Sequence, residues 1–128
     1  MRGTSSDIDN ASVVLRLVYG EISFLLTGDI FSEAEADLVA RDSLIDSDVL
    51  KVAHHGSRTS SIDEFLDAVS PAAVVVSVGE DNRFGHPHPQ TVTALLGHVP
   101  GDRVYLTSER GDIEFVTDGT RLEVNTGR

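Results

Sequence analysis

Four of the five histidines in this 128-residue chain lie in two short polar segments, and histidine is a residue that binds metals and moves protons. His54 and His55 belong to the segment VAHHGSRTSS, whereas His86 and His88 belong to NRFGHPHPQT. Asp29 ends the segment LLTGD, directly after a glycine. Carboxylate oxygen and neutral imidazole nitrogen together suit a divalent cation, and one carboxylate can bridge two such cations. Because the chain has no cysteine, any metal must be held by His, Asp or Glu.

Each of these residues also has an ordinary structural explanation. An aspartate such as Asp29, which follows a glycine at a strand end, is commonly a turn or helix-cap residue. A pair of adjacent histidines can equally be a surface or core feature, and His88, between two prolines, suits a rigid turn. His98 stands apart near a predicted helix end, where it would interact with the helix dipole. From the spacing alone, a metal site and a structural role both remain open.

The charged residues restrict the kinds of partner. The chain has 21 acidic and 10 basic residues, a formal net charge of −11, which would repel a phosphate backbone over most of the surface. Generic nucleic-acid coating is therefore not expected. Lys51, Arg58 and Arg83 nevertheless lie in or beside the two histidine segments, where together they could hold one phosphate. Taken singly, each is an ordinary solvated surface charge.

The elements that would position these residues follow from apolar runs and turn signals. Strands are predicted where β-branched and apolar residues cluster, at 12–18, 22–27, 49–53, 73–78, 103–107, 113–117 and 121–125. Helices are predicted where apolar residues recur at helical spacing, at 32–41, 61–70 and 89–99. The first two helices open with the capping-box pattern S-x-x-E, and the third opens at Pro89. We expect the first two strands to form a hairpin and to be central in the sheet.

This order of elements predicts one α/β (α+β) domain with a mixed sheet and three helices mainly on one face. Asp29 and the His54-His55 pair would then follow neighbouring strands, at the sheet edge where ligand sites commonly lie. Each helix has a single apolar stripe, so the other face of such an apolar sheet needs a partner. We therefore expect the chain to expose a large apolar face or to self-associate.

Five motifs together resemble the metallo-β-lactamase-like domain that ends ComEC-type DNA-internalisation proteins. They are DNASVVLRL, FLLTGD, DVLKVAHHGS, SVGEDNRFGHPHP and YLTSERGDIEFVTDG, and they cover nearly the whole chain. HHGS followed by NRFGHP is the specific combination. The resemblance implies a zinc-dependent hydrolase with two metal ions, a DNA substrate, and Asp29 as the bridging ligand. It implies a second ligand at His55, with His54 as the alternative.

The same resemblance implies that His86, with Arg58 or Arg83, binds the substrate phosphate or transfers a proton. It also implies features that this sequence does not contain. Members of the family begin this domain with an HxHxDH segment, whereas the first histidine here is His54. Residues 1–128 are therefore expected to be a single domain that forms the C-terminal half of an αββα sandwich and lacks the HxHxDH half.

Three expectations depend on that incompleteness. The chain alone should bind zinc weakly and hydrolyse no DNA. Its partners should be the missing N-terminal half of the domain and, in the longer protein, an upstream membrane region. That longer protein would hold this domain outside the cytoplasm, although the chain itself has no apolar run long enough to span a bilayer. The alternatives are part of a stand-alone hydrolase of the same fold and a non-catalytic half-domain.

Overall fold

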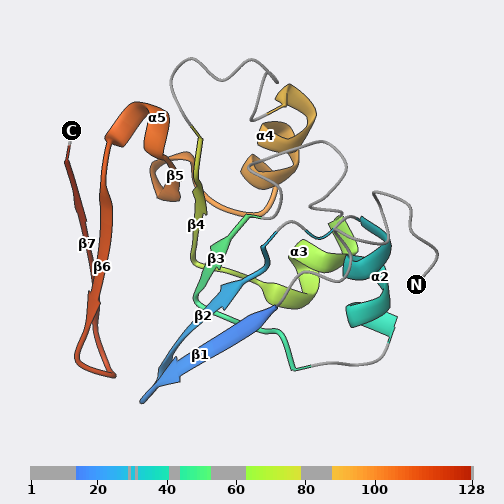
Figure 1. Ribbon diagram of the computed structural model, residues 1–128, viewed down its shortest axis with the longest axis horizontal. Helices are drawn as coiled ribbons and strands as arrows, with labels where there is room; N and C mark the ends of the chain where they lie inside the picture. The colour runs from blue at the N-terminus through green and yellow to red at the C-terminus, as the bar shows by residue number, and fades with distance from the viewer. Residues whose placement is uncertain are drawn as a thin grey trace.

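The computed structural model describes residues 14–28, 30, 32–40, 44–52, 63–78 and 88–127. Within them, two strands form a hairpin and are followed by alternating helices and strands (Figure 1). The strands are β1 (Leu15–Tyr19), β2 (Ile22–Leu26), β3 (Val49–Lys51), β4 (Ala73–Val76), β5 (Val104–Leu106), β6 (Ile113–Thr117) and β7 (Leu122–Thr126). The helices are α2 (Ser32–Ala40), α3 (Asp63–Val69), α4 (Pro89–Leu96), the 3-10 helix η2 (Gly101–Arg103) and α5 (Thr107–Arg110).

Five of these strands form one mixed sheet in the order β1-β2-β3-β4-β5. β1 pairs antiparallel with β2, and every later pairing in this sheet is parallel. Leu50 in β3 pairs with Leu25 in β2 on one side and with Val74 in β4 on the other. The predicted α/β class with a mixed sheet is therefore confirmed.

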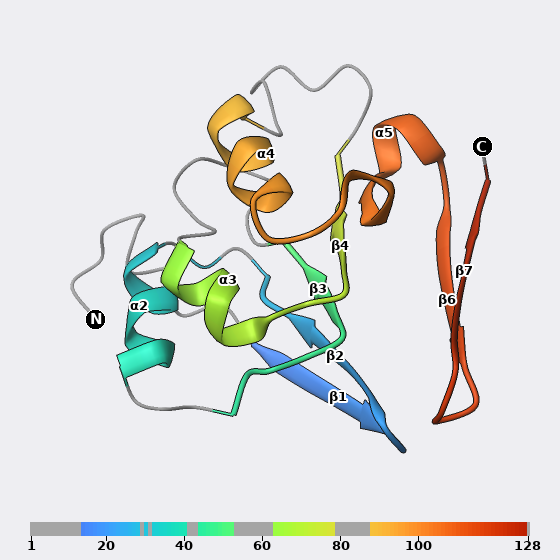
Figure 2. The same cartoon turned by 180° about the vertical axis from the view of Figure 1, so that it is seen from behind.

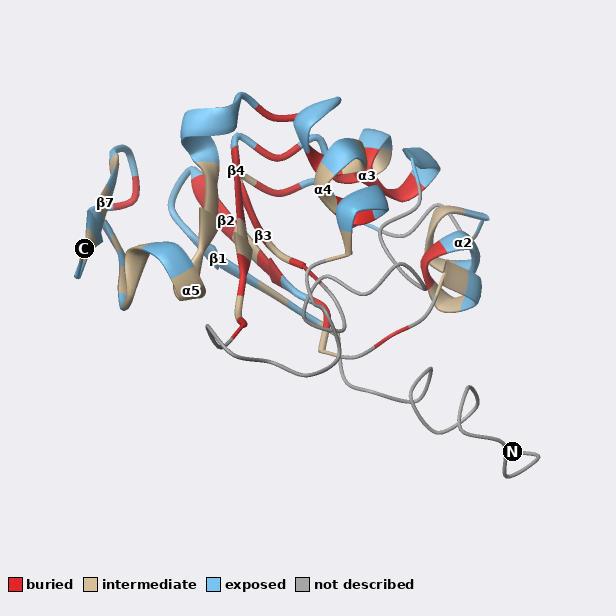
Figure 3. Ribbon diagram, turned by 90° about the horizontal axis from the view of Figure 1, so that it is seen from above, coloured by how far each residue is buried: buried red, intermediate tan, exposed pale blue. Residues whose placement is uncertain are grey.

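Helices α2, α3 and α4 lie on one face of this sheet (Figure 3). The strand order explains why. From β2 to β5 each strand is added beside the previous one and in the same direction, so each connecting helix is a parallel crossover. Such crossovers are almost always right-handed, and crossovers of one hand that move in one direction along a sheet place their helices on the same face. The predicted one-sided arrangement of the three helices is thus confirmed.

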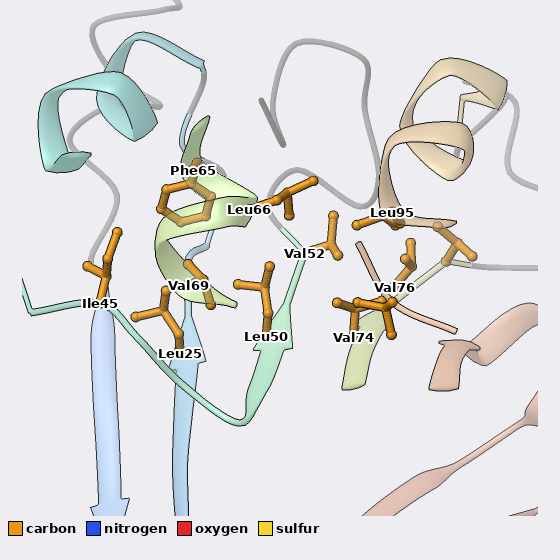
Figure 4. Packing of buried hydrophobic residues seen from close by; sticks show 12 residues of the cluster. Leu25, Ile45, Leu50, Val52, Phe65, Leu66, Val69, Val74, Val76 and Leu95 are labelled. Atoms are coloured by element: carbon orange, nitrogen blue, oxygen red, sulfur yellow. The ribbon is translucent and has the colours of Figure 1, made fainter. Parts of the chain in front are cut away.

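The core lies between these helices and the sheet, and α3 is at its centre (Figure 4). Phe65, Leu66 and Val69 recur at helical spacing and are at most 1% exposed. They pack in one cluster with Leu25 and Leu50, which are also 1% exposed. Burying side chains of this size contributes roughly 1.5–3 kcal/mol each to folding. This layer therefore fixes the order and spacing of the strands that lead to the candidate site.

The opposite face of the sheet is partly covered by the antiparallel β6–β7 hairpin, which forms a separate two-stranded sheet. Phe115 in β6 meets Phe24 in β2 and Tyr105 in β5 edge to face, with ring centroids 6.1 and 6.0 Å apart. The turns of the two hairpins lie at the same end of the molecule (Figures 1 and 2). There the Glu21 backbone N–H donates a hydrogen bond of 2.6 Å to the carbonyl oxygen of Gly119.

The rest of that face is an open apolar groove of about 740 Å³ beside β6. Leu17, Tyr19 and Leu26 line it and are 59%, 58% and 38% exposed, respectively. The expected exposed apolar face is therefore present in the described part of the chain. The prediction that strand 12–18 is central was wrong, because β1 is the edge strand of the sheet among the strands that the structure describes. Its apolar residues indicated burial, yet the described strands that follow β2 are all added on the other side of β2.

Among the helices that the structure describes, none is long and apolar enough to cross a membrane.

Candidate functional site

Six of the seven side chains predicted to bind metal or phosphate lie outside the residues that the structure describes. They are Asp29, His54, His55, Arg58, Arg83 and His86. The structure does describe the strands and helices that lead directly into and out of these segments. The structure therefore gives the arrangement of the elements that flank the candidate site.

Three parallel strands direct the chain toward one edge of the sheet. β2, β3 and β4 run in the same direction, so their carboxyl ends lie side by side. Leu26 at the end of β2 pairs with Lys51 at the end of β3. Asp29 comes three residues after Leu26, and His54 comes three residues after Lys51. The candidate carboxylate and the first candidate imidazole, that of His54, thus follow directly paired positions at equal distances along the chain, and His55 comes one residue later.

The Thr27 hydroxyl ties the ends of β2 and β3 together. Thr27 is fully buried, and its Oγ1 donates a hydrogen bond of 2.7 Å to the carbonyl oxygen of Lys51. On the other side of β3, the Val52 backbone N–H donates to the carbonyl oxygen of Val75 at 2.9 Å. Sequence reasoning missed Thr27, and the available signal was a hydroxyl-bearing residue at the carboxyl end of the predicted strand 22–27.

The end of β4 is held by a hydroxyl from α5. Thr107 Oγ1 accepts a hydrogen bond from the Val78 backbone N–H at 2.8 Å and donates to the Val78 carbonyl oxygen at 2.7 Å. Both polar groups of the last described residue before segment 79–87 are therefore satisfied by one side chain. This contact fixes where the chain enters the second histidine segment.

The chain leaves that segment through His88, which is extended at φ −68° and ψ 144° between its two prolines. This extended conformation is the one that a following proline favours. The rigid turn around His88 stays a prediction. The His88 carbonyl oxygen accepts hydrogen bonds from the backbone N–H groups of Thr91 and Val92 at 2.9 and 3.1 Å, and these bonds start α4. The Thr91 hydroxyl is buried and has no hydrogen-bond partner within the described residues.

His98 has a different role from the helix-dipole contact expected for it. Its Nε2 lies 3.2 Å from Asp63 Oδ1, and its Nδ1 lies 3.2 Å from Asp67 Oδ1. Asp63 and Asp67 are one turn apart on α3, so the ring connects the segment after α4 to α3. Across the described ranges, no group of three or more His, Asp or Glu side chains is arranged to hold a metal ion.

Lys51, predicted as part of a phosphate-binding set, ends β3 at the same sheet edge and is partly exposed. Its ammonium group forms no ion pair with the other residues that the structure describes. Of the three basic residues in the predicted set, Lys51 is the one that lies within the described residues. Arg58 and Arg83 remain predictions.

Comparison with known proteins gives homologues that include the following three. ComE operon protein 3 of Bacillus subtilis is 37% identical over 84% of this chain and 14% of its own length. Competence protein ComA of Neisseria gonorrhoeae is 37% identical over 85% of the chain and 16% of its own length. Recombination protein 2 of Haemophilus influenzae is 33% identical over 98% of the chain and 15% of its own length.

No family model and no solved structure matches the chain. The similarity to these three homologues covers 84 to 98% of this chain, yet it covers only 14 to 16% of each homologue. The chain is therefore homologous to a segment that makes up 14 to 16% of proteins that include a ComE operon protein and a competence protein.

Proposed function

We propose that this chain is the C-terminal part of a metallo-β-lactamase-like hydrolase domain, and that the domain cleaves phosphodiester bonds of DNA during DNA uptake. The pairing of Leu26 with Lys51 carries the proposal, because Asp29 follows Leu26 by three residues and the His54-His55 pair follows Lys51 by three and four residues. Ligands of one metal must lie close together, and paired ends of parallel strands are an arrangement that brings them close.

The donor set fits a zinc-type cation. Asp29 supplies a carboxylate that can bridge two ions, and His55 supplies an imidazole, with His54 as the alternative. Two zinc ions bound there would supply hydroxide at neutral pH. His86, with Arg58 or Arg83, would bind the phosphate and provide a proton for the leaving oxygen.

This ligand set is incomplete for tight binding. Zinc sites use three or four protein ligands, and the sequence contains no HxHxDH segment that would add the others. We propose that another half of the domain supplies them and packs against the apolar face lined by Leu17, Tyr19 and Leu26. Alone, the chain would bind zinc weakly and use the same face to self-associate.

The names of the homologues support DNA uptake as the process. We propose that the longer protein includes membrane-spanning segments and holds this domain outside the cytoplasm. The membrane-spanning segments and the location outside the cytoplasm are properties of the longer protein, so both are tested on that protein.

The proposal is tested by comparing the chain alone with a longer protein in which it is joined to an HxHxDH segment. Zinc content and cleavage of single-stranded DNA are measured for both. We expect zinc and nuclease activity in the longer protein only, and loss of both in Asp29→Ala. The matched control is Asp102→Ala, an exposed aspartate in η2 at the other edge of the sheet, which should leave both unchanged.

Two results would contradict the proposal. One is nuclease turnover by the 128-residue chain that survives Asp29→Ala. The other is a longer protein that keeps its full zinc content after the same substitution. Either result would show that the metal site, if one exists, is not built on the β2 end.

A further inference from the structure

A second cavity lies at the opposite edge of the sheet from the candidate metal site. It has a volume of about 530 Å³, within the range of small-molecule sites. One wall consists of residues at or just before the amino ends of β2, β3, β4 and β5, and the other wall comes from the β7 side of the hairpin. The lining residues used below are Ile22, Asp48, Arg103, Tyr105 and Leu122.

Asp48 presents a fixed carboxylate to this cavity. Its Oδ2 accepts hydrogen bonds from the Ser23 backbone N–H at 2.9 Å and from the Ser23 hydroxyl at 3.3 Å. Its own backbone carbonyl accepts from the N–H groups of Ala72 and Ala73 at 2.8 and 3.1 Å. A carboxylate has about four lone-pair positions, so Asp48 can still accept a hydrogen bond from a ligand.

Arg103 brings a positive charge to the same cavity. It is exposed, and its guanidinium has no side-chain partner within the described part of the chain. No ion pair joins Arg103 to Asp48 among the described side chains, although both line the cavity. In a chain of net charge −11, an unpaired guanidinium beside a cavity is a local exception that can attract an anion.

Tyr105 and the apolar wall complete the site. The Tyr105 ring is held by the edge of Phe115 at 6.0 Å and by Arg110, whose guanidinium carbon lies 5.8 Å from the ring centroid. Its hydroxyl forms no hydrogen bond with any other residue that the structure describes, so it can donate to an anion beside Arg103. Ile22 and Leu122 add apolar surface to the lining of the same cavity.

We propose that this cavity binds one nucleotide of a nucleic-acid strand. The phosphate would bind the Arg103 guanidinium and the Tyr105 hydroxyl, since arginine suits phosphate recognition. The base would lie against Ile22 and Leu122, and its exocyclic amino group would donate a hydrogen bond to Asp48, as aspartate accepts from the N4 amino group of cytosine. The choice of a nucleotide rests on the proposed function, because it takes nucleic acid as the substrate.

This arrangement predicts a base preference. Cytosine, adenine and guanine have an exocyclic amino group, whereas thymine has none. Among deoxynucleoside monophosphates, the one with thymine should therefore bind most weakly. The phosphate contribution should fall as salt is added, because it is electrostatic.

The test uses amide and arginine side-chain NMR shifts of the 128-residue chain titrated with dCMP or dTMP in the presence of EDTA. We expect saturable shifts around Arg103 and Ala73, with dCMP bound at least about threefold more tightly than dTMP. Arg103→Met should weaken dCMP binding about tenfold or more. The control is Arg121→Met, an exposed arginine of the β6–β7 turn that does not line the cavity, which should bind as the parent chain does.

Asp48→Asn isolates the base contact, because asparagine keeps an acceptor oxygen for the Ser23 N–H. It should abolish the preference for dCMP over dTMP while leaving the amide spectrum of the fold intact. Absence of saturable shifts up to about 10 mM nucleotide, or unchanged binding in Arg103→Met, would overturn the proposal. EDTA removes any metal, so these results are independent of whether the other edge of the sheet is a hydrolase site.

Discussion

Replacing Thr27 by valine should destabilise the chain by about 1–2 kcal/mol. The substitution keeps the volume and branching of the side chain and removes only its hydroxyl. Thr27 is fully buried, and its hydroxyl donates a hydrogen bond of 2.7 Å to the Lys51 carbonyl oxygen. Valine cannot donate this bond, so the Lys51 carbonyl oxygen loses the hydroxyl donor that connects the end of β3 to the end of β2. For a chain of this size, the change corresponds to a lowering of Tm by roughly 3–10 °C.

The measurement is urea unfolding followed by circular dichroism, with thermal unfolding as a second readout. The matched control is Thr93→Val, because the Thr93 hydroxyl also donates to a carbonyl, that of Pro89 at 3.0 Å, but on the exposed side of α4. The control should change the free energy of unfolding by no more than about 0.5 kcal/mol. Equal effects of the two substitutions would refute the idea that a buried hydrogen bond of the Thr27 hydroxyl stabilises the contact between the ends of β2 and β3.

Three further outcomes concern the β6–β7 hairpin. Gly20→Ala should cost roughly 1–3 kcal/mol, because Gly20 has φ +61° and an added Cβ would lie 2.6 Å from the Gly119 carbonyl oxygen; unchanged urea unfolding would show that the two turns do not meet in solution. Phe115→Ala should remove two aromatic contacts of about 0.5–1.5 kcal/mol each and accelerate proteolytic cutting within the hairpin, whereas parent-like cutting would contradict the packing. Hydrogen bonds from the backbone N–H groups of Arg121 and, with a smaller effect, Thr120 lower the pKa of Asp118. The Asp118 carboxylate should therefore stabilise the hairpin at pH values above its unfolded-state pKa. This stabilisation should be lost as the pH falls through the folded-state pKa. Carboxyl NMR titration giving the pKa of an aspartate in an unstructured peptide would refute this.

The sequence predicted most elements correctly where burial and local signals agree. The segments 22–27, 49–53 and 73–78 are mainly apolar, and they contain the strands β2, β3 and β4. The hairpin turn at Asp118-Gly119 has the residues that such turns require, and β6 and β7 flank it as predicted. These features depend on neighbours in sequence, so sequence reasoning can find them.

The misses depend on contacts between distant segments. The helix predicted to reach residue 99 ends at Leu96, and Val99 is buried from the following turn rather than from the helix. The α5 helix, Thr107–Arg110, has only four residues and therefore no periodic pattern. Its first residue bonds the end of β4, which no local signal indicates.

The candidate site was predictable in chemistry and only partly in position. The clustering of histidines and the isolated Asp29 are visible in the sequence. The direct pairing of Leu26 with Lys51 is not visible, because it depends on the register between two strands separated by a helix. The positions of the six side chains outside the described residues stay predictions. The structure provides the register of the strands that precede Asp29 and the His54-His55 pair.

The sequential strand order also bears on how this chain reaches its fold. From β1 to β5 every strand pairs with the strand that precedes it in the chain, so no strand has to be inserted between two already paired ones. The sheet can therefore grow in one direction as the polypeptide emerges during synthesis, with each helix docking before the next strand arrives. Among the described strands, β6 and β7 pair with each other and with no strand of the larger sheet, so this hairpin can be added last. Slow refolding of this domain should then arise from the parallel pairings, which close the longest loops, rather than from rearrangement of strand order.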